Sequence, residues 1–424
     1  MDTVPREHFI PYRLTDLVRL ILGKAPAGVR PSPEDTPAFT TFSRLLCATV
    51  HQEYHDRLLD LNDLYAPFDP NADTIQIESH SAARLTAIQG DFRERLKALL
   101  IRANYQAVTA TELNEALATE SVFKVRLHTQ LDDFADLVVF RRGTRRRQEI
   151  VPRFLGFGRR LVEVIYFERV VLCVRFKESE HFSARAKRLP FTPGSMVLKL
   201  FQNIPKADLE MLLPNSEVRM RTLDKFMIGI PAVIGVAGMT AKLAVVISFL
   251  IGLSLWVSHQ TGLHDQPVNL PLNMAEFTAI AAACLTLYLF INRQLMNYRY
   301  RRIQFMQALT QGLYFKNLDN NAGVIHHVVG EAEEEDAKEA LLAYGFLRAA
   351  PQGLTPAELD ERIEAWFKEL GQTIDFEVED GLAKLERFGL LSRRDGRLTV
   401  PALDEATRRL DARWDALFTP TTTA

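Results

Sequence analysis

The sequence predicts an α+β membrane protein with a helical N-terminal region, a small antiparallel sheet, a two-helix transmembrane hairpin and a C-terminal winged-helix-like domain. Three observations predict this class. Two long apolar runs occupy 226–258 and 274–291, segments between 161 and 201 are rich in β-branched and aromatic residues, and an Asp395-Gly396 turn follows three helical patterns. The 424 residues exceed the usual size of one domain. We therefore expect two or three folding units. The apolar runs and the expected helices and strands divide the chain into five regions, at 1–135, 136–225, 226–293, 294–330 and 331–424.

Composition narrows the class of protein. The chain is 47% hydrophobic and 25% charged, which excludes a disordered or collagen-like chain, and its net charge of -2 excludes a surface built throughout for nucleic acid. Three distant cysteines, without a C-x-x-C pair, indicate a reducing compartment. The first residues lack the basic and apolar segments of a secretory signal.

The N-terminal region shows apolar residues three and four apart, as in helices, up to about residue 135. Strands are expected at 161–167, 170–176 and 196–201, with 137–141 as a fourth candidate. Lys206 to Leu213 is expected to form a short helix before Pro214.

The transmembrane hairpin is predicted from apolar length. Lys242 is the single charge between Phe226 and Val257, and the expected first crossing runs from Met239 to Ser258. The segment from Phe226 to Gly238 is expected to lie at the membrane interface as an approach to the crossing. The alternative is that it belongs to one tilted span. The second run carries charges only at its edges. The expected membrane-interface residues are Lys242, Trp256, Glu276 and Arg293.

Flanking charge sets the expected orientation. Arginine and lysine precede the first run and follow the second, whereas 259–273 contains neither. The positive-inside rule then places both termini in the cytoplasm of a bacterial plasma membrane. Small residues at four-residue spacing predict close helix packing within the hairpin or between copies in a homo-oligomer; they are Ser248, Gly252, Ala275, Ala279 and Ala283.

The C-terminal part begins with a stalk helix after the second run. Helices are then expected at 333–347, from Thr355-Pro356 to about Leu370, and at 376–388, followed by the turn at Asp395 and a last helix. Residues 331–424 hold 12 Lys and Arg against 21 Asp and Glu, a net charge of -9. This charge repels phosphate, so the winged-helix-like region is expected to bind a protein partner and not nucleic acid.

Few side chains suggest chemistry. His51 and His55 share a helical face at a spacing that suits one metal ion, although Gln52 stands where a zinc protease helix carries Glu. A pair of histidines without a metal is the alternative. The region from Asp319 to His327 offers further polar side chains, with helix capping as its alternative. No cofactor is indicated.

An arginine-rich stretch covers 141–160, which contains eight arginines and a single acidic residue, Glu149. We expect its first members to bind anionic lipid of the bilayer, or to pair with the acidic C-terminal region. These residues are Arg141, Arg142, Arg145, Arg146 and Arg147.

Several stretches together carry a family resemblance, among them Arg6-Glu-His-Phe-Ile-Pro-Tyr-Arg-Leu, Tyr65-Ala-Pro-Phe-Asp-Pro, Ile204-Pro-Lys-Ala-Asp-Leu and Leu313-Tyr-Phe-Lys-Asn-Leu-Asp-Asn-Asn. The chain resembles an uncharacterised membrane family, a domain of unknown function that includes mitochondrial transmembrane protein 143. The resemblance implies two spans and no known reaction.

The function expected from these observations is that of a membrane-anchored, non-enzymatic scaffold or regulator whose cytoplasmic domains bind a partner or self-assemble. Two alternatives remain open. One is an enzyme at the membrane surface, using a metal at His51 and His55 or the region from Asp319 to His327. The other is an oligomeric channel or transport component that uses the hairpin.

Overall fold

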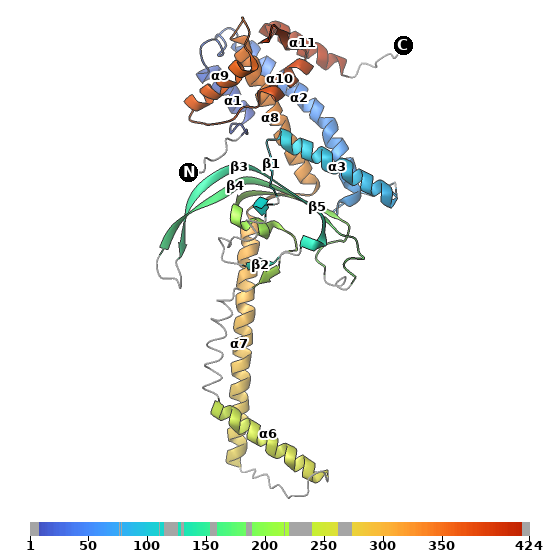
Figure 1. Ribbon diagram of the computed structural model, residues 1–424, viewed down its shortest axis with the longest axis vertical. Helices are drawn as coiled ribbons and strands as arrows, with labels where there is room; N and C mark the ends of the chain where they lie inside the picture. Colours follow the sequence, from blue (N-terminus) through green and yellow to red (C-terminus); the bar gives the residue numbers. More distant parts are fainter. Residues whose placement is uncertain are drawn as a thin grey trace. The chain divides into compact units, whose positions relative to one another are not determined.

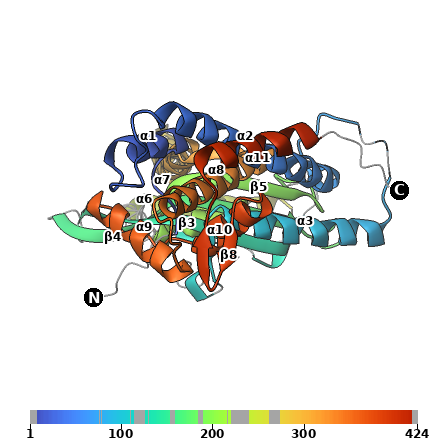
Figure 2. The same ribbon diagram turned by 90° about the horizontal axis from the view of Figure 1, so that it is seen from above.

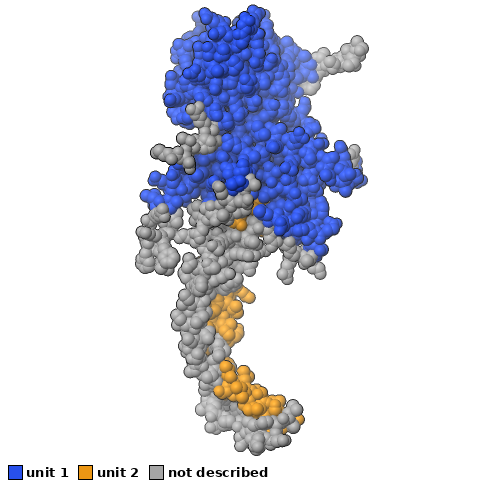
Figure 3. Space-filling model, in the orientation of Figure 1, with its two compact units in different colours: residues 1–116, 131–209, 316–424 blue, residues 117–130, 210–315 orange. Residues whose placement is uncertain are grey.

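The structure is a computed structural model. It describes residues 8–75, 77, 79–109, 111–113, 126–128, 131–152, 159–183, 189–215, 217–219, 240–261 and 274–417. Contacts divide the chain into two compact units, which Figure 3 distinguishes by colour. Unit 1 comprises 1–116, 131–209 and 316–424, and unit 2 comprises 117–130 and 210–315. The two ends of the chain therefore fold together in unit 1.

Unit 1 is rich in helices, which follow the predicted apolar spacing. They are α1 (Leu14–Lys24), α2 (Thr36–Tyr65), α3 (Ala82–Arg102), α8 (Ala322–Arg348), α9 (Pro356–Glu369), α10 (Val378–Arg387) and α11 (Leu403–Ala416). The start of α9 has a local cause. Thr355 and Glu358 form a reciprocal capping box, and Pro356 occupies the first turn, where its missing N–H costs nothing.

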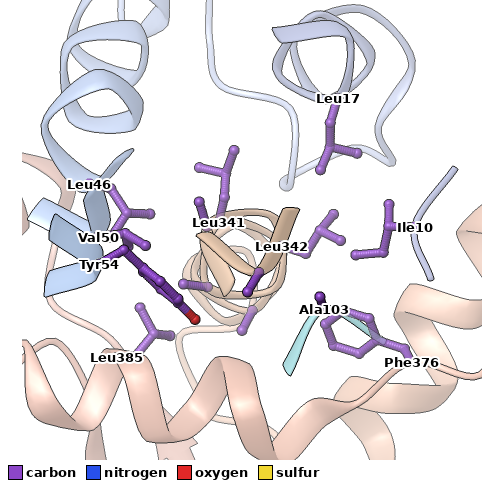
Figure 4. Close-up of a cluster of buried hydrophobic side chains, with 14 of the residues drawn as sticks. Ile10, Leu17, Leu46, Val50, Tyr54, Ala103, Leu341, Leu342, Phe376 and Leu385 are labelled. Carbon is purple, nitrogen blue, oxygen red and sulfur yellow. The ribbon is translucent and has the colours of Figure 1, made fainter. Parts of the chain in front are cut away.

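The core of unit 1 forms around α8, which contacts α1, α2, α3, α9 and α10. Figure 4 shows Leu341 and Leu342 of α8 between Val50 of α2 on one side and Ile10 on the other. All four side chains are fully buried. Because other elements surround α8, its polar side chains are buried together with its apolar ones. Buried polar side chains need hydrogen-bond or ion-pair partners.

A five-stranded antiparallel sheet completes unit 1. Its strands, in spatial order, are β1 (Gln106–Ala107), β3 (Phe134–Pro152), β4 (Arg159–Phe176), β5 (Met196–Pro205) and β7 (Asn317–Asn320). The helices α2, α3 and α8 lie on one side of the sheet (Figures 1 and 2). Phe140, Val171 and Leu200 belong to the same buried cluster as the helical core.

The strands differ from the prediction in length and number. The two strands expected at 161–167 and 170–176 are one continuous strand, β4, paired with β3 from Arg159 to Phe176. The edge strands β1 and β7 were not predicted because each has at most four residues, too few for a visible alternation. A 3-10 helix, Lys206–Leu212, follows β5 where a short helix was expected.

The C-terminal elements lie in the predicted order. After α8, α9 and α10, a hairpin pairs β8 (Ser392–Arg394) with β9 (Arg397–Thr399). Its turn residues Asp395 and Gly396 both have positive φ, 49° and 74°, as a two-residue type I′ turn requires. An isolated antiparallel bridge joins Leu354 to Leu398 of β9.

Unit 2 contains a short pair of strands, β2 (Arg126–His128) and β6 (Glu217–Arg219), and two helices, α6 (Thr240–Gln260) and α7 (Met274–Tyr314). The apolar run predicted as the second span forms only the first part of α7. This helix continues through Arg293 and Arg299 for 41 residues in all.

The predicted transmembrane hairpin is wrong. A crossing helix needs about 20 consecutive apolar residues. Within the part of the chain that the structure describes, none of the helices combines the length and the apolar character needed to span a bilayer. The fold is a mixed α/β fold with a five-stranded antiparallel sheet. The membrane class and the plasma-membrane localisation with both termini cytoplasmic, which rested on the hairpin, are corrected with it.

Candidate functional site

The polar residues of α8 form the most unusual chemical feature of unit 1. Glu335, Asp336, Lys338 and Glu339 are each at most 2% exposed. Charged side chains are almost never buried to this extent unless they are paired. The partners of these residues therefore indicate what the helix does.

Glu335 and Lys338 together hold the backbone of Ile10. The Glu335 carboxylate accepts a hydrogen bond from the Ile10 N–H at 3.1 Å, and Lys338 Nζ donates to the Ile10 carbonyl at 3.3 Å. The two side chains also pair with each other at 2.8 Å. Four residues after Ile10, the Leu14 N–H donates to the Glu334 carboxylate at 2.8 Å. The N-terminal segment is thus fixed against α8 by charge-assisted hydrogen bonds.

Asp336 joins three other helices to α8. Its Oδ2 accepts a hydrogen bond from the Tyr54 hydroxyl of α2 at 2.7 Å and lies 2.5 Å from Lys384 Nζ of α10. Arg102 of α3 is 3.6 Å from the same oxygen. Lys384 also contacts Glu53 at 3.2 Å. Burial first, and then the charge of Asp336, raise the pKa of the Tyr54 hydroxyl, so this hydroxyl stays a donor.

Glu331 joins α8 to the sheet. Its carboxylate lies 2.6 Å from Arg142 Nη2 of β3 and accepts a hydrogen bond of 2.6 Å from the Tyr105 hydroxyl. The Arg142 guanidinium also donates to the Ala103 carbonyl at 3.0 Å and stacks over the rings of Phe9 and Tyr105. Arg142 is 6% exposed. Every side of this buried cation is therefore occupied by a protein group.

The start of α8 brings Asp319 and His327 together. His327 Nδ1 lies 3.9 Å from Asp319 Oδ2, and its Nε2 lies 3.6 Å from Glu331 Oε1. Between them, Asn321 has a φ of 50°, which is rare outside glycine. Its N–H donates to the Leu198 carbonyl at 2.8 Å, and its side-chain oxygen accepts from the Leu198 N–H at 3.2 Å. These bonds to β5 fix the direction in which α8 leaves the sheet.

Glu339 differs from the other acids of α8. Among the described residues, its carboxyl group has no recorded hydrogen bond or ion pair. Burial, and after it the charges of Glu335, Asp336, Asp380 and Glu377, raise its pKa well above the usual value. Burial and these charges therefore favour the neutral form of the group. A helix packs closely beside it, because a Cβ on Gly381 of α10 would lie 2.9 Å from the Glu339 carbonyl oxygen.

Metal-binding clusters and reactive thiols are two kinds of site at which a protein can carry out catalysis. The described residues contain no group of three or more His, Cys, Asp or Glu side chains arranged to hold a metal ion. Burial is the main cause that raises the pKa of Cys47 to about 11 and that of Cys173 to about 12, so both thiols are poor nucleophiles at neutral pH. The arrangement on α8 mainly holds separate segments of the chain together.

His51 and His55 lie on α2, as predicted. Both histidines are exposed, and His51 Nδ1 is 2.9 Å from Glu333 Oε2 of α8. The structure thus gives His51 one acidic neighbour that the sequence did not suggest. Metal binding at this pair stays a prediction.

The five arginines of 141–147 have mostly acidic neighbours. Arg142 pairs with Glu331, which fits the alternative of pairing with the acidic C-terminal region, and Arg141 lies 3.7 Å from Glu112. Arg145 and Arg146 pair with glutamates of β4, and Arg147 stacks over Tyr166. Their binding to anionic lipid stays a prediction.

The residues chosen for a membrane interface or for helix packing fall in α6 and α7. Trp256, Ser248 and Arg293 are exposed, Gly252 is partly buried and Ala283 is buried. The side chains of Lys242, Ala275, Glu276 and Ala279, and the segment from Phe226 to Gly238, lie outside the described residues. Helix packing through the small residues stays a prediction.

The sequence did not reveal the buried charges of α8. It predicted the helix but not the burial of its acidic residues, whose partners lie up to 325 positions away. One signal was available. Lys338 stands three and four positions after Glu335 and Glu334, directly before a long apolar run, which is a spacing that suits ion pairs at the edge of a core.

Comparison with known proteins assigns part of the chain. The profile of a family described as a protein of unknown function, DUF3754, matches residues 167–323. The match begins at Phe167 within β4, covers β5, β6, α6, α7 and β7, and ends at Gly323, just inside α8. It supports the expected domain of unknown function and gives no link to transmembrane protein 143 or to membranes. No solved structure matches the chain.

Proposed function

We propose that unit 1 is a non-enzymatic scaffold or regulator that binds a protein partner. One observation carries this proposal: the buried charged residues of α8 hold segments from both ends of the chain. Glu335 holds Ile10, Asp336 holds Tyr54 and Lys384, and Glu331 holds Arg142. The carboxylates of Glu331, Glu335 and Asp336, which could serve as acids or bases in catalysis, thus hold other segments of the chain in place.

The arrangement around His327 supports a structural role over a catalytic one. A histidine beside an acid resembles a catalytic pair, but Glu331, on the far side of the imidazole, is already bound by Arg142 and Tyr105. A general base needs a free nitrogen directed at a substrate. Here the two ring nitrogens face Asp319 and Glu331, at 3.9 and 3.6 Å.

The charge of the C-terminal region favours a protein partner over nucleic acid. Residues 331–424 have a net charge of -9, and nucleic acid binding depends on neutralising phosphates with cations. The partner surface that complements this region is basic.

The test is photo-crosslinking of the full chain in its own cells. A crosslinking amino acid replaces one of three exposed apolar residues of unit 1, Leu59, Ile101 or Trp414. We expect a discrete crosslinked protein from at least one position, retained in a His327→Ala variant. The absence of any crosslinked protein at all three positions, or a substrate turnover that His327→Ala abolishes, would overturn the proposal.

A further inference from the structure

We infer that a groove between the first turns of α9 and α10 binds a basic, partly apolar segment of a protein partner. This inference rests on the proposed function, since it names the surface and the chemistry by which unit 1 would take its partner. The groove lies wholly within unit 1.

The groove has the size and lining of a peptide subsite. Its volume is about 500 Å³. Its apolar lining consists of Pro356, Ala357, Phe376 and Val378, of which Phe376 and Val378 are 5% and 8% exposed. Such a lining accepts an aliphatic side chain, or the methylene stem of a lysine or arginine.

The polar lining is entirely acidic. Asp360, Glu377, Glu379 and Asp380 line the groove, and neither lysine nor arginine is among the lining residues. Acidic residues in the first turn of a helix normally gain from the helix dipole. Glu377 departs from this expectation, because it makes no capping hydrogen bond. Burial raises its pKa, His8 lowers it, and Asp380 and Asp375 raise it further, with a net increase. The negative charge here exceeds what the helix start requires.

Glu339, inside the core, is affected by this excess. It is 2% exposed, and Asp380 and Glu377 are among the charges that raise its pKa. A cation placed in the groove would therefore reduce the repulsion among the groove acids and would lower the pKa of Glu339.

The chain itself shows how a basic side chain can be held at the edge of the groove. His8 Nδ1 lies 3.1 Å from the Asp375 carbonyl oxygen and 3.4 Å from Glu377 Oε1. A backbone oxygen and a carboxylate thus converge on one nitrogen. A lysine or arginine of a partner can use the same kind of pair, with stronger charge.

The experiment measures binding of a short fluorescent peptide in which arginine and lysine alternate with leucine. A second peptide has glutamate in place of each basic residue. Fluorescence anisotropy with the full chain is recorded at about 50 mM and about 300 mM salt, since screening weakens charge-driven binding. We expect the basic peptide alone to bind, and more weakly at the higher salt concentration.

The deciding variant neutralises three groove acids at once, as E377Q/E379Q/D380N. We expect the affinity for the basic peptide to fall about tenfold or more. The matched control, E361Q/E369Q, neutralises two exposed acids on α9 that do not line the groove, and is expected to bind like the unaltered chain. Circular dichroism checks that each variant is folded.

Three results would contradict the inference that this groove binds a basic segment. They are no binding of the basic peptide, equal binding of both peptides, or an equal loss of affinity for the basic peptide in the two variants. None of these results decides the proposed function, because the crosslinking positions Leu59, Ile101 and Trp414 do not line the groove. Crosslinking without peptide binding would mean that unit 1 uses another surface.

Discussion

Lys384 of α10 and Asp336 of α8 form an ion pair with 2.5 Å between Nζ and Oδ2, and the two side chains are 1% and 2% exposed. The pair connects helices that are 48 positions apart and lies beside Tyr54 of α2. A buried pair of this kind is costly to break, because removal of one partner leaves an uncompensated charge away from water.

We therefore predict that Lys384→Met lowers the free energy of unfolding by about 3 kcal/mol. Urea denaturation followed by circular dichroism measures the change. Lys368→Met, an exposed lysine on α9, serves as the control and should cost less than about 0.5 kcal/mol. The double variant D336N/K384M should lose less than the sum of its single variants, since the two residues are coupled. Strict additivity would contradict the pairing.

The sequence predicted the features that depend on neighbouring residues, but not the contacts between residues far apart in the chain. Local signals sufficed for α9, where Thr355, Pro356 and Glu358 mark the start, and for the turn at Asp395-Gly396. The pairing of Ile10 with Lys338 had no local signal, because 328 positions separate the two residues and either can form other contacts. Long-range pairing of charges is decided by tertiary packing, which periodicity does not encode.

The apolar runs show a different reason for error. Hydropathy and flanking arginines predicted two crossing helices, but none of the described helices is long and apolar enough to span a bilayer. The second run and the stalk helix expected after it form one helix, α7, which continues through Arg293 to Tyr314. For the candidate site, the sequence pointed to the region from Asp319 to His327 but gave no reason to connect it with Glu331 and Arg142.

Glu339 predicts an unusual dependence of stability on pH. Its folded pKa lies above the ordinary value of 4.5 because of burial and the neighbouring charges of Glu335, Asp336, Asp380 and Glu377. The folded state then binds a proton more tightly than the unfolded chain does. The stability contributed by this proton is present below about pH 4.5 and is lost as the pH rises through the folded pKa.

Glu339→Gln replaces the ionisable carboxyl group by an amide, which has nearly the same shape and stays uncharged. We predict that the variant is more stable than the unaltered chain at about pH 8, and that the difference shrinks towards about pH 4.5. Each unit by which the pKa is raised corresponds to about 1.4 kcal/mol. Glu369→Gln, on the exposed face of α9, should not change the pH dependence. A Glu339→Gln variant that is less stable at about pH 8 would show that the carboxylate has a partner.

Gly381 predicts a steric limit between α8 and α10. A Cβ at this position would lie 2.9 Å from the Glu339 carbonyl oxygen, and backbone cannot move aside cheaply. Gly381→Ala should therefore destabilise the chain by about 1 to 3 kcal/mol, although alanine is the better helix former.

The matched control for Gly381→Ala is Gly90→Ala in α3, where a Cβ would meet nothing within 4 Å. This substitution should stabilise the chain by about 0.5 to 1 kcal/mol, since alanine restricts the unfolded chain without a clash. Thermal unfolding of both variants shows whether each one is more or less stable than the unaltered chain. A stabilising Gly381→Ala would mean that α8 and α10 lie further apart than the structure shows.

The three cysteines should react at different rates with an aromatic disulfide reagent. Burial raises the pKa of Cys47 to about 11 and that of Cys173 to about 12, so few thiolates form at neutral pH, whereas Cys284 on α7 is exposed. Because the thiolate is the reacting species, we predict one fast thiol per folded chain and three after unfolding in urea. Cys284→Ser should abolish the fast phase and leave the slow reaction unchanged. If two thiols react fast, or if the fast phase survives in Cys284→Ser, then Cys47 or Cys173 is more accessible than its burial in unit 1 implies, and the packing of α2 or of β4 would need revision.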